Sequence, residues 1–97
     1  MKLRYTPTAF VQLQEIAAYI GAHNPYGATR VQARIKHMID LLIDFPKIGT
    51  PTDDPVIRRI ATPPYPYVVY YELTADEIII HAVRHGARDP GSAPGRA

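Results

Sequence analysis

The chain has 97 residues, of which 46% are hydrophobic and 21% are charged, and this length suits one small domain but excludes a multidomain enzyme or a fold of several βαβ units. It contains no cysteine, which excludes disulfides, thiolate zinc sites, iron–sulfur clusters and thiol nucleophiles. The formal net charge is +2, and all but three of the 11 basic residues are arginines, whose planar guanidinium favours carboxylate or phosphate partners.

The N-terminal residues predict a short strand followed by a helix. Residues 3–6 alternate apolar and polar side chains, as a strand does. Thr6 and Pro7 then suit the cap and the first position of a helix, and Gly21 marks its end. Apolar residues between these points recur at helical spacing. They are Phe10, Leu13, Ile16, Ala17 and Ile20.

Asn24 and Pro25 repeat the cap-and-proline arrangement and begin a second predicted helix. Its apolar residues recur in steps of three and four, which predicts a seam packed along another helix. They are Ala28, Val31, Ile35, Met38, Leu42 and Phe45. Two amphipathic helices joined by a short turn predict an antiparallel helical hairpin.

The periodicity changes after the second helix. Residues 45–55 are rich in proline and glycine and predict a loop, whereas residues 56–60, 67–73 and 77–83 are rich in β-branched and aromatic side chains and predict strands. The last two strands are joined by residues 74–76, a connection of hairpin length. The expected fold is therefore α+β, with an N-terminal strand, the helical hairpin, and a three-stranded antiparallel sheet packed on the hairpin.

Residues 1–89 are predicted to form this single domain. Residues 90–97 contain no large apolar side chain, which predicts a disordered tail. No apolar run approaches the ~18 residues of a membrane-spanning helix, and residues 1–4 do not begin a signal peptide. We therefore expect a cytoplasmic protein with no membrane partner.

The four histidines do not have the spacing of a metal site. His81 and His85 are four residues apart, which on a strand is about 13 Å and too far to ligate one ion. Their even separation allows them to share a face of the sheet. Because the chain has no cysteine and few carboxylates nearby, we predict solvated or hydrogen-bonded imidazoles, with no metal and no other cofactor.

Arginines on the predicted strands are the candidates for a functional surface. Arg58 and Arg59 lie on one strand, Arg84 and His85 end another, and Arg88 follows soon after. Strand alternation places adjacent residues on opposite faces, so only about half of this set can line one cavity. A plain alternative is that these arginines cover sheet edges and pair with surface carboxylates. Against it, two adjacent arginines interrupt an otherwise apolar pattern, as happens at functional surfaces.

The pattern does not decide which face of the sheet is buried. Residues 78–80 are all isoleucine, so the last strand is apolar on both faces. The sequence therefore does not decide which half of the arginine set lies together on one face.

Several short motifs follow one another along nearly the whole chain. Tyr-Thr-Pro precedes the first helix at residues 5–7, Phe-Pro-Lys-Ile-Gly closes the second at residues 45–49, and Arg59 lies on the next strand. An aromatic strand follows at residues 67–71, and residues 78–89 read Ile-Ile-Ile-His-Ala-Val-Arg-His-Gly-Ala-Arg-Asp. This succession resembles the RelE/ParE superfamily of bacterial toxins.

The resemblance implies the toxin of a type II toxin–antitoxin pair, neutralised by a small antitoxin. It also implies one of two activities. RelE-like members cleave mRNA at the ribosome without a metal, with Lys, Arg, His, Glu or Tyr side chains as acid, base and phosphate-binding groups. ParE-like members poison DNA gyrase and are not known as nucleases. A member that binds an antitoxin but poisons nothing is a third alternative.

The residues favour the ParE-like branch. RNA cleavage needs a proton acceptor, a proton donor and cations around one phosphate, and His85 with Arg59 and Arg84 would have to supply them. The paired lysines of some RelE-like nucleases are absent, with only Lys47 in that region, and no aromatic residue follows Tyr71. The C-terminal end of the domain is also more similar to ParE.

We therefore expect a poison of DNA gyrase in a hetero-oligomer with a ParD-like antitoxin. Arg59, Arg84 and Arg88 are the residues expected to contact the target. If the protein is instead a metal-independent mRNA interferase, the catalytic set would be His85, Arg84 and Arg59, and the target would be the ribosome with its mRNA. An amphipathic antitoxin segment is expected to lie along the helical hairpin or to add to a sheet edge. The residues expected to contact it are Leu13, Ile20, Val31 and Ile35.

Overall fold

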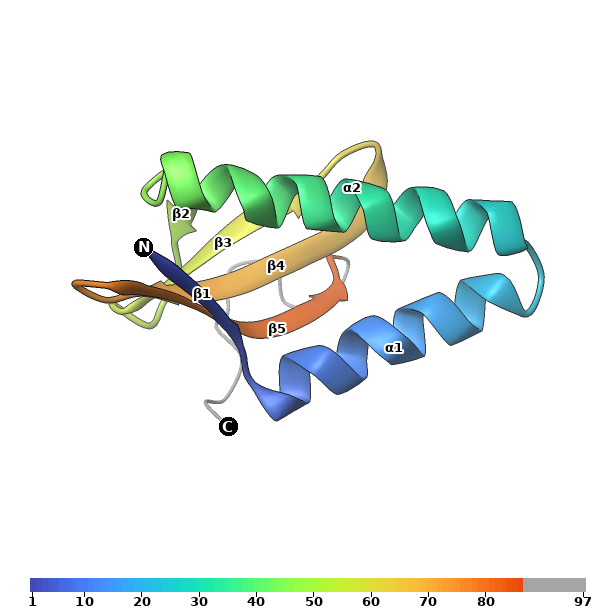
Figure 1. Ribbon diagram of the computed structural model, residues 1–97, viewed down its shortest axis with the longest axis horizontal. Coiled ribbons are helices and arrows are strands. Elements are labelled where there is room, and N and C mark those ends of the chain that lie inside the picture. Colours follow the sequence, from blue (N-terminus) through green and yellow to red (C-terminus); the bar gives the residue numbers. More distant parts are fainter. Residues whose placement is uncertain (87–97) are drawn as a thin grey trace.

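The computed structural model describes residues 1–86, so the predicted end of the domain at residue 89 and the tail at residues 90–97 lie outside the described residues. Two helices are followed by most of a five-stranded sheet (Figure 1). In chain order the elements are β1 (Lys2–Tyr5), α1 (Pro7–Gly21), α2 (Pro25–Asp44), β2 (Thr50–Pro51), β3 (Ile57–Thr62), β4 (Tyr65–Leu73) and β5 (Glu77–His85). Within residues 1–86, neither helix combines the length and the apolar character needed to cross a membrane.

Both helices begin at the cap-and-proline pairs that the sequence predicts. The Thr6 hydroxyl oxygen accepts a hydrogen bond from the Ala9 N–H at 3.1 Å, at the start of α1. Asn24 Oδ1 accepts from the Gly27 N–H at 2.8 Å, at the start of α2. A Cβ at residue 27 would lie 2.7 Å from the Asn24 side chain, so glycine lets this cap approach the helix.

The five strands form one mixed sheet in the order β1-β5-β4-β3-β2. β3, β4 and β5 are antiparallel neighbours, as predicted. The prediction of a purely antiparallel, three-stranded sheet is corrected at both edges: β1 pairs parallel with β5, and the two-residue β2 pairs antiparallel with β3. β1 meets its partner only after the chain has passed through both helices, and β2 lies in the proline-rich loop, so neither pairing has a local sequence signal.

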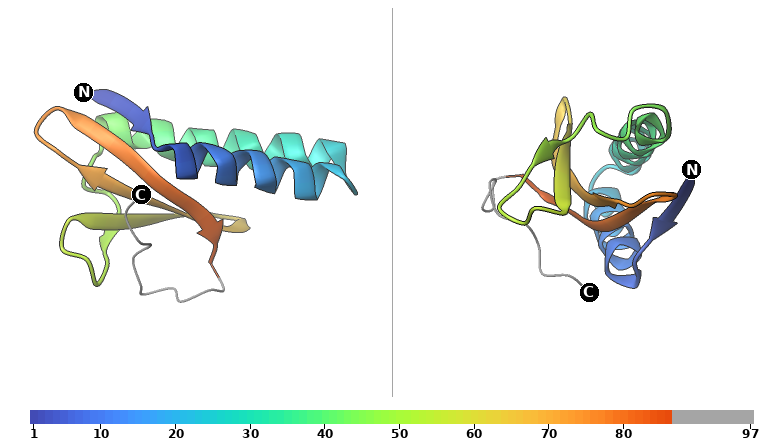
Figure 2. Two further views of the ribbon diagram at one scale, coloured as in Figure 1. Left: turned by 90° about the horizontal axis from the view of Figure 1, so that it is seen from below. Right: turned by 90° about the vertical axis from the view of Figure 1, so that its left-hand side faces the viewer.

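The helical hairpin covers one face of the sheet, while no helix of residues 1–86 lies on the opposite face (Figure 2). α1 packs mainly on β5, and α2 packs on β3 and β4. The core between these layers includes most of the apolar seam of α2, as the helical spacing predicts. Its buried residues are Ala9, Val31, Ile35, Ile39, Leu42, Ile60, Val69, Tyr71, Ile78, Ile80 and Val83.

A bulge in β5 changes which residues face the hairpin. The pairing with β4 passes from Tyr70–Ala82 to Tyr71–Ile80, so His81 is an extra residue without its own partner. An extra residue reverses the alternation of side chains on either side of it. Ile80 therefore faces the hairpin together with residue 83, whereas Ala82 joins a second cluster on the opposite face.

This second cluster is small and tightly buried. Ile57, Val68, Tyr70 and Ala82 form it, and none of the four is more than 4% exposed. The strands are thus apolar on both faces near their centre, which explains why the run of isoleucines in β5 did not identify the hairpin side.

Candidate functional site

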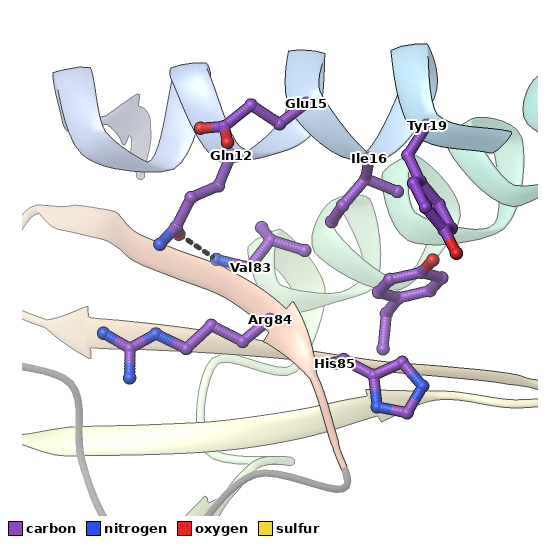
Figure 3. Close-up of a pocket in the computed structure, with 8 residues that line it drawn as sticks. Gln12, Glu15, Ile16, Tyr19, Val83, Arg84 and His85 are labelled. Carbon is purple, nitrogen blue, oxygen red and sulfur yellow. Dashed lines mark hydrogen bonds between the residues drawn. The ribbon is translucent and has the colours of Figure 1, made fainter. Parts of the chain in front are cut away.

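The two described arginines that were predicted to contact a target lie on the same face of the sheet. Arg59 is paired with Tyr70, and Arg84 is paired with Val68. Because paired residues on neighbouring antiparallel strands share a face, both arginines lie on the side opposite the hairpin. Arg84 is exposed, and its guanidinium extends past β5 on the side away from α1 (Figure 3). The third predicted contact, Arg88, lies outside the described residues.

Arg59 carries a hydrogen-bond donor with no acceptor. Its side chain is partly buried, and its Nε is fully buried without a hydrogen-bond partner in the described part of the chain. A buried polar group left unsatisfied costs free energy, and the cost is larger for a charged group. Because this Nε is buried, a carboxylate or phosphate oxygen of a partner would satisfy it only after the Arg59 side chain had turned outward.

Arg58 has a different role from its neighbour. It lies on the other face from Arg59, as alternation predicts, and its pairing with Tyr71 places it on the hairpin side. Its Nη1 donates to the carbonyl oxygen of Gly49 at 2.7 Å, with a longer contact to that of Lys47 at 3.4 Å. These bonds hold the loop after α2 against the sheet, so Arg58 is a structural residue.

His85 lies in a groove between α1 and the end of β5 (Figure 3). Its ring makes an edge-to-face contact with Tyr67, with the ring centroids 5.8 Å apart and the planes at 77°. The groove has a volume of about 650 Å³. Its lining residues are Gln12, Glu15, Ile16, Tyr19, Tyr67, Val83, Arg84 and His85. The structure thus brings Arg84 and His85 to one groove and leaves Arg59 outside it.

The sequence prediction missed the α1 side of this groove. Gln12, Glu15 and Tyr19 recur in steps of three and four, which places them on one stripe of α1. Gln12 is held in place because its Oε1 accepts a hydrogen bond from the Val83 N–H at 2.8 Å. The spacing of these three polar residues, beside the apolar seam, is the sequence signal that identifies the stripe.

Gln12 lies where β5 has no neighbouring strand on its α1 side. β1 pairs with β5 only as far as Tyr5 and Ile80. Beyond that point Thr6 donates twice, from its N–H to the Ile80 carbonyl at 3.0 Å and from its hydroxyl to the His81 carbonyl at 3.3 Å. Thr6 and the side chain of Gln12 therefore satisfy backbone groups of β5 that a longer β1 would have paired.

His81 is buried on the face opposite His85. Its Nε2 lies 2.8 Å from Glu72 Oε1, and its side chain is 9% exposed. Its Nδ1 is buried and has no partner among the described residues. The two histidines do not share the face that their even separation would allow, because the bulge at His81 reverses the alternation between them. Within residues 1–86, no cluster of three or more His, Cys, Asp or Glu side chains could hold a metal ion.

The residues predicted to contact an antitoxin belong to the packed hairpin. Val31 and Ile35 are 5% and 1% exposed and lie in the core. Leu13 and Ile20 are partly buried against the same core. Contact between Val31 or Ile35 and an antitoxin would require the hairpin to move on the sheet, and the role of all four residues stays a prediction.

Comparison with known proteins finds toxins that are similar to this chain in sequence. The sequence is 34% identical over 79 residues to the putative toxin Y4kP of Sinorhizobium fredii, which covers 81% of this chain and 82% of that protein. It is 31% identical over 84 residues to the toxin RelE2 of Caulobacter vibrioides, which covers 87% of this chain and 93% of that protein.

A solved structure shares the fold. A chain of the chromosomal ParDE TA system from P. aeruginosa superimposes with a TM-score of 0.78 at 20% sequence identity, covering 88% of this chain and 95% of that one. The family described as ParE toxin of type II toxin-antitoxin system, parDE, matches residues 3–90. Because this match spans nearly the whole sequence, the chain belongs to the ParE toxin family of type II toxin–antitoxin systems.

Proposed function

We propose that this toxin poisons DNA gyrase and is not itself an enzyme. The observation that carries the choice is the separation of Arg59 from His85 by the sheet. Arg59 lies on the face opposite the hairpin, whereas His85 lies on the hairpin side against Tyr67. A metal-independent nuclease needs its cations and its proton-transfer groups around one phosphate. With the sheet between them, Arg59 and His85 do not meet that requirement in the arrangement expected for mRNA cleavage.

The target surface in this proposal is the face opposite the hairpin. Arg59 contributes the buried Nε that lacks an acceptor, and Arg84 contributes an exposed guanidinium on the same face. An acidic group or a phosphate of the gyrase–DNA complex would pair directly with Arg84, and would reach the Arg59 Nε once that side chain had turned outward. Arg88 is included in the proposal on its sequence position alone.

An antitoxin of the ParD type is the proposed partner that neutralises the toxin. The proposed location of the toxin, its antitoxin and its target is the cytoplasm. The domain is small and has no disulfide, so a protein that binds only its folded form would stabilise it. An amphipathic segment can lie on the helical hairpin or extend a sheet edge. Such binding would raise the melting temperature of the toxin in proportion to the logarithm of antitoxin concentration.

Ribosome-dependent cleavage of mRNA is the second candidate function, and the groove between α1 and β5 favours it. Glu15, Tyr19 and His85 line this groove together with Arg84. These are side chains that can transfer protons and stabilise a phosphorane. One relative, named as a toxin RelE2, is consistent with either branch of the superfamily.

The test is induced expression in a bacterial host, with pulse-labelling of DNA and protein synthesis over the first minutes. Arrest of DNA synthesis before translation supports gyrase poisoning, and a gyrase cleavage-complex assay with the purified toxin then checks the target directly. Arrest of translation first overturns the gyrase proposal in favour of mRNA cleavage. Unimpaired growth with soluble protein present would mean that the chain poisons neither target.

A further inference from the structure

A second groove lies between α2 and the turn that joins β3 to β4, away from both surfaces described above. Its volume is about 610 Å³. We name it the α2 groove, and its lining residues are Arg30, Ala33, Arg34, His37, Pro63, Pro64 and Tyr65. Helix α2 supplies one wall, and the turn at residues 63–64 with the start of β4 supplies the other.

The wall from α2 is basic. Arg30, Arg34 and His37 follow one another in steps of four and three, so they form one stripe along the helix. Arg34 Nε donates to the Pro63 carbonyl oxygen at 2.6 Å, which fixes this guanidinium at the edge of the groove. The two terminal nitrogens of Arg34 make no hydrogen bond within residues 1–86, so their N–H groups can donate to a ligand.

Intramolecular carboxylates do not neutralise this stripe. No Asp or Glu lines the α2 groove, and the side chains of Arg30 and His37 make no hydrogen bond or ion pair within residues 1–86. The acidic residue on α2 with an ion pair is Asp40, and its partner is Lys36 at 2.8 Å. The positive charge at the groove is therefore available to a partner from outside the chain.

The floor of the groove is apolar and stiff. Ala33 contributes a methyl group from α2, and Pro63, Pro64 and Tyr65 contribute rings from the turn. Proline rings have no side-chain rotamer freedom, and the tyrosine ring has little, so burying them against a ligand costs little conformational entropy. A ligand that fits this floor must offer apolar side chains as well as negative charge.

We propose that the α2 groove binds an acidic segment of the antitoxin, one that places glutamate or aspartate against Arg30 and Arg34 and an apolar side chain on Pro64 and Tyr65. The inference rests on the antitoxin partner proposed above and specifies where and through which chemistry that partner binds. Arginine pairs with carboxylates in a bidentate geometry. Apolar burial between these pairs adds affinity that charge alone does not supply.

Nucleic acid fits the α2 groove less well. A phosphate backbone has nothing to bury on the apolar floor, and specific protein–DNA interfaces commonly engage about 6–10 phosphates. This stripe offers two arginines and a histidine, on a chain whose formal net charge is only +2. The observations therefore favour a peptide.

The probe is a short fluorescent peptide of alternating Leu-Leu and Glu-Glu pairs, titrated into the full-length chain made by cell-free synthesis. Two matched peptides replace either every Glu by Gln or every Leu by Ser, and a DNA duplex serves as competitor. Amide chemical shifts locate the bound peptide. The inference predicts saturable binding that weakens with salt, needs both Leu and Glu, and shifts amides at Arg30, Arg34 and Tyr65.

Arg30→Glu is the test variant, because Arg30 is exposed and its side chain makes no hydrogen bond or ion pair within residues 1–86. Lys47→Glu is the matched control, since it reverses one exposed charge outside the groove. We expect Arg30→Glu to weaken peptide binding by about tenfold and Lys47→Glu to change it by less than about twofold. Equal effects of the two variants, shifts confined to other surfaces, or displacement of the peptide by DNA would each overturn the inference. These outcomes are independent of growth arrest, which tests the proposed toxin activity separately.

Discussion

The hydroxyl of Tyr71 lies where a side chain on residue 49 would have to be. The Gly49 N–H donates to the Tyr71 hydroxyl oxygen at 2.9 Å, and that hydroxyl donates to the Pro46 carbonyl at 2.8 Å. A Cβ on Gly49 would lie 2.5 Å from the same oxygen and 2.9 Å from the carbonyl oxygen of Arg59. The glycine that ends the Phe-Pro-Lys-Ile-Gly motif is thus explained by the packing of this loop on β4 and β3.

Gly49→Ala is therefore expected to destabilise the protein. The new methyl group must displace the Tyr71 hydroxyl or the β3 backbone, and overpacking of this kind costs about 1–3 kcal/mol. Thermal unfolding measures the effect. Gly21→Ala is the control, because its Cβ would lie 3.7 Å from Ala28 Cβ, an ordinary contact. A melting temperature that falls equally in both variants would contradict the close packing at Gly49.

The same tyrosine makes the stability of the folded protein depend on pH in the alkaline range. Burial raises the pKa of Tyr71 above its ordinary value of 10.0, against smaller opposing effects of the Gly49 N–H and the charge of Arg58. Burial also raises the pKa of Tyr5. The folded state then keeps protons that the unfolded state releases, so this contribution is fully present below pH 10 and is lost as the pH rises through the folded pKa values.

We expect the melting temperature to fall above about pH 10, with a shallower fall in Tyr71→Phe and the shallowest in the double variant with Tyr5→Phe. Melting curves recorded across the alkaline range, with tyrosinate absorbance on the same samples, measure both quantities. A pH dependence that is the same in the double variant as in the unmodified chain would assign the effect to other groups.

The adjacent arginines of β3 are expected to lose different amounts of stability on truncation. Arg58→Ala removes the bond to the Gly49 carbonyl at 2.7 Å and is expected to cost about 1–2 kcal/mol of stability. Arg59→Ala removes a buried donor that has no partner within residues 1–86 and is expected to cost less. Urea unfolding ranks the two variants. A larger loss for Arg59→Ala would mean that its side chain is chiefly structural, which would weaken its proposed role at the target.

Much of the fold follows from local sequence signals, because caps and helical periodicity act over a few residues. Thr6 and Asn24 accept the capping hydrogen bonds that their positions predict. The parallel pairing of Tyr5 with Ile80 had no such signal, since the two residues are brought together only by the folded hairpin. Local sequence signals therefore predict the helices and strands. The edges of the sheet depend on pairing between residues that are far apart in the sequence.

The candidate site shows the same division. Alternation correctly separated Arg58 from Arg59, but the apolar character of both faces concealed which one joins Arg84. The sequence allowed His81 and His85 to share a face, and the structure places them on opposite faces. The bulge that separates them is set by cross-strand pairing and leaves no simple mark in the sequence. The α1 side of the groove at His85 was missed because the apolar seam of that helix is the stronger pattern.

Arg84→Ala is expected to abolish growth arrest while the purified protein keeps its melting temperature. The side chain is exposed, and exposed substitutions away from structural contacts usually change stability by less than about 0.5 kcal/mol. Lys47→Ala, which removes an exposed charge elsewhere, is expected to leave growth arrest unchanged. If melting falls in step with toxicity in Arg84→Ala, the residue acts by supporting the end of the sheet.

His85→Ala separates the two candidate functions most directly. Under the gyrase proposal the target surface is on the other face, so growth arrest is expected to persist. The variant loses the edge-to-face contact with Tyr67, which is worth about 0.5–1.5 kcal/mol, so toxicity should be compared well below the melting temperature. Glu15→Gln, in the same groove but without a ring contact, controls for that loss. If both variants restore translation in cells that the unmodified chain arrests, the groove is an RNA-cleaving site and the gyrase proposal is wrong.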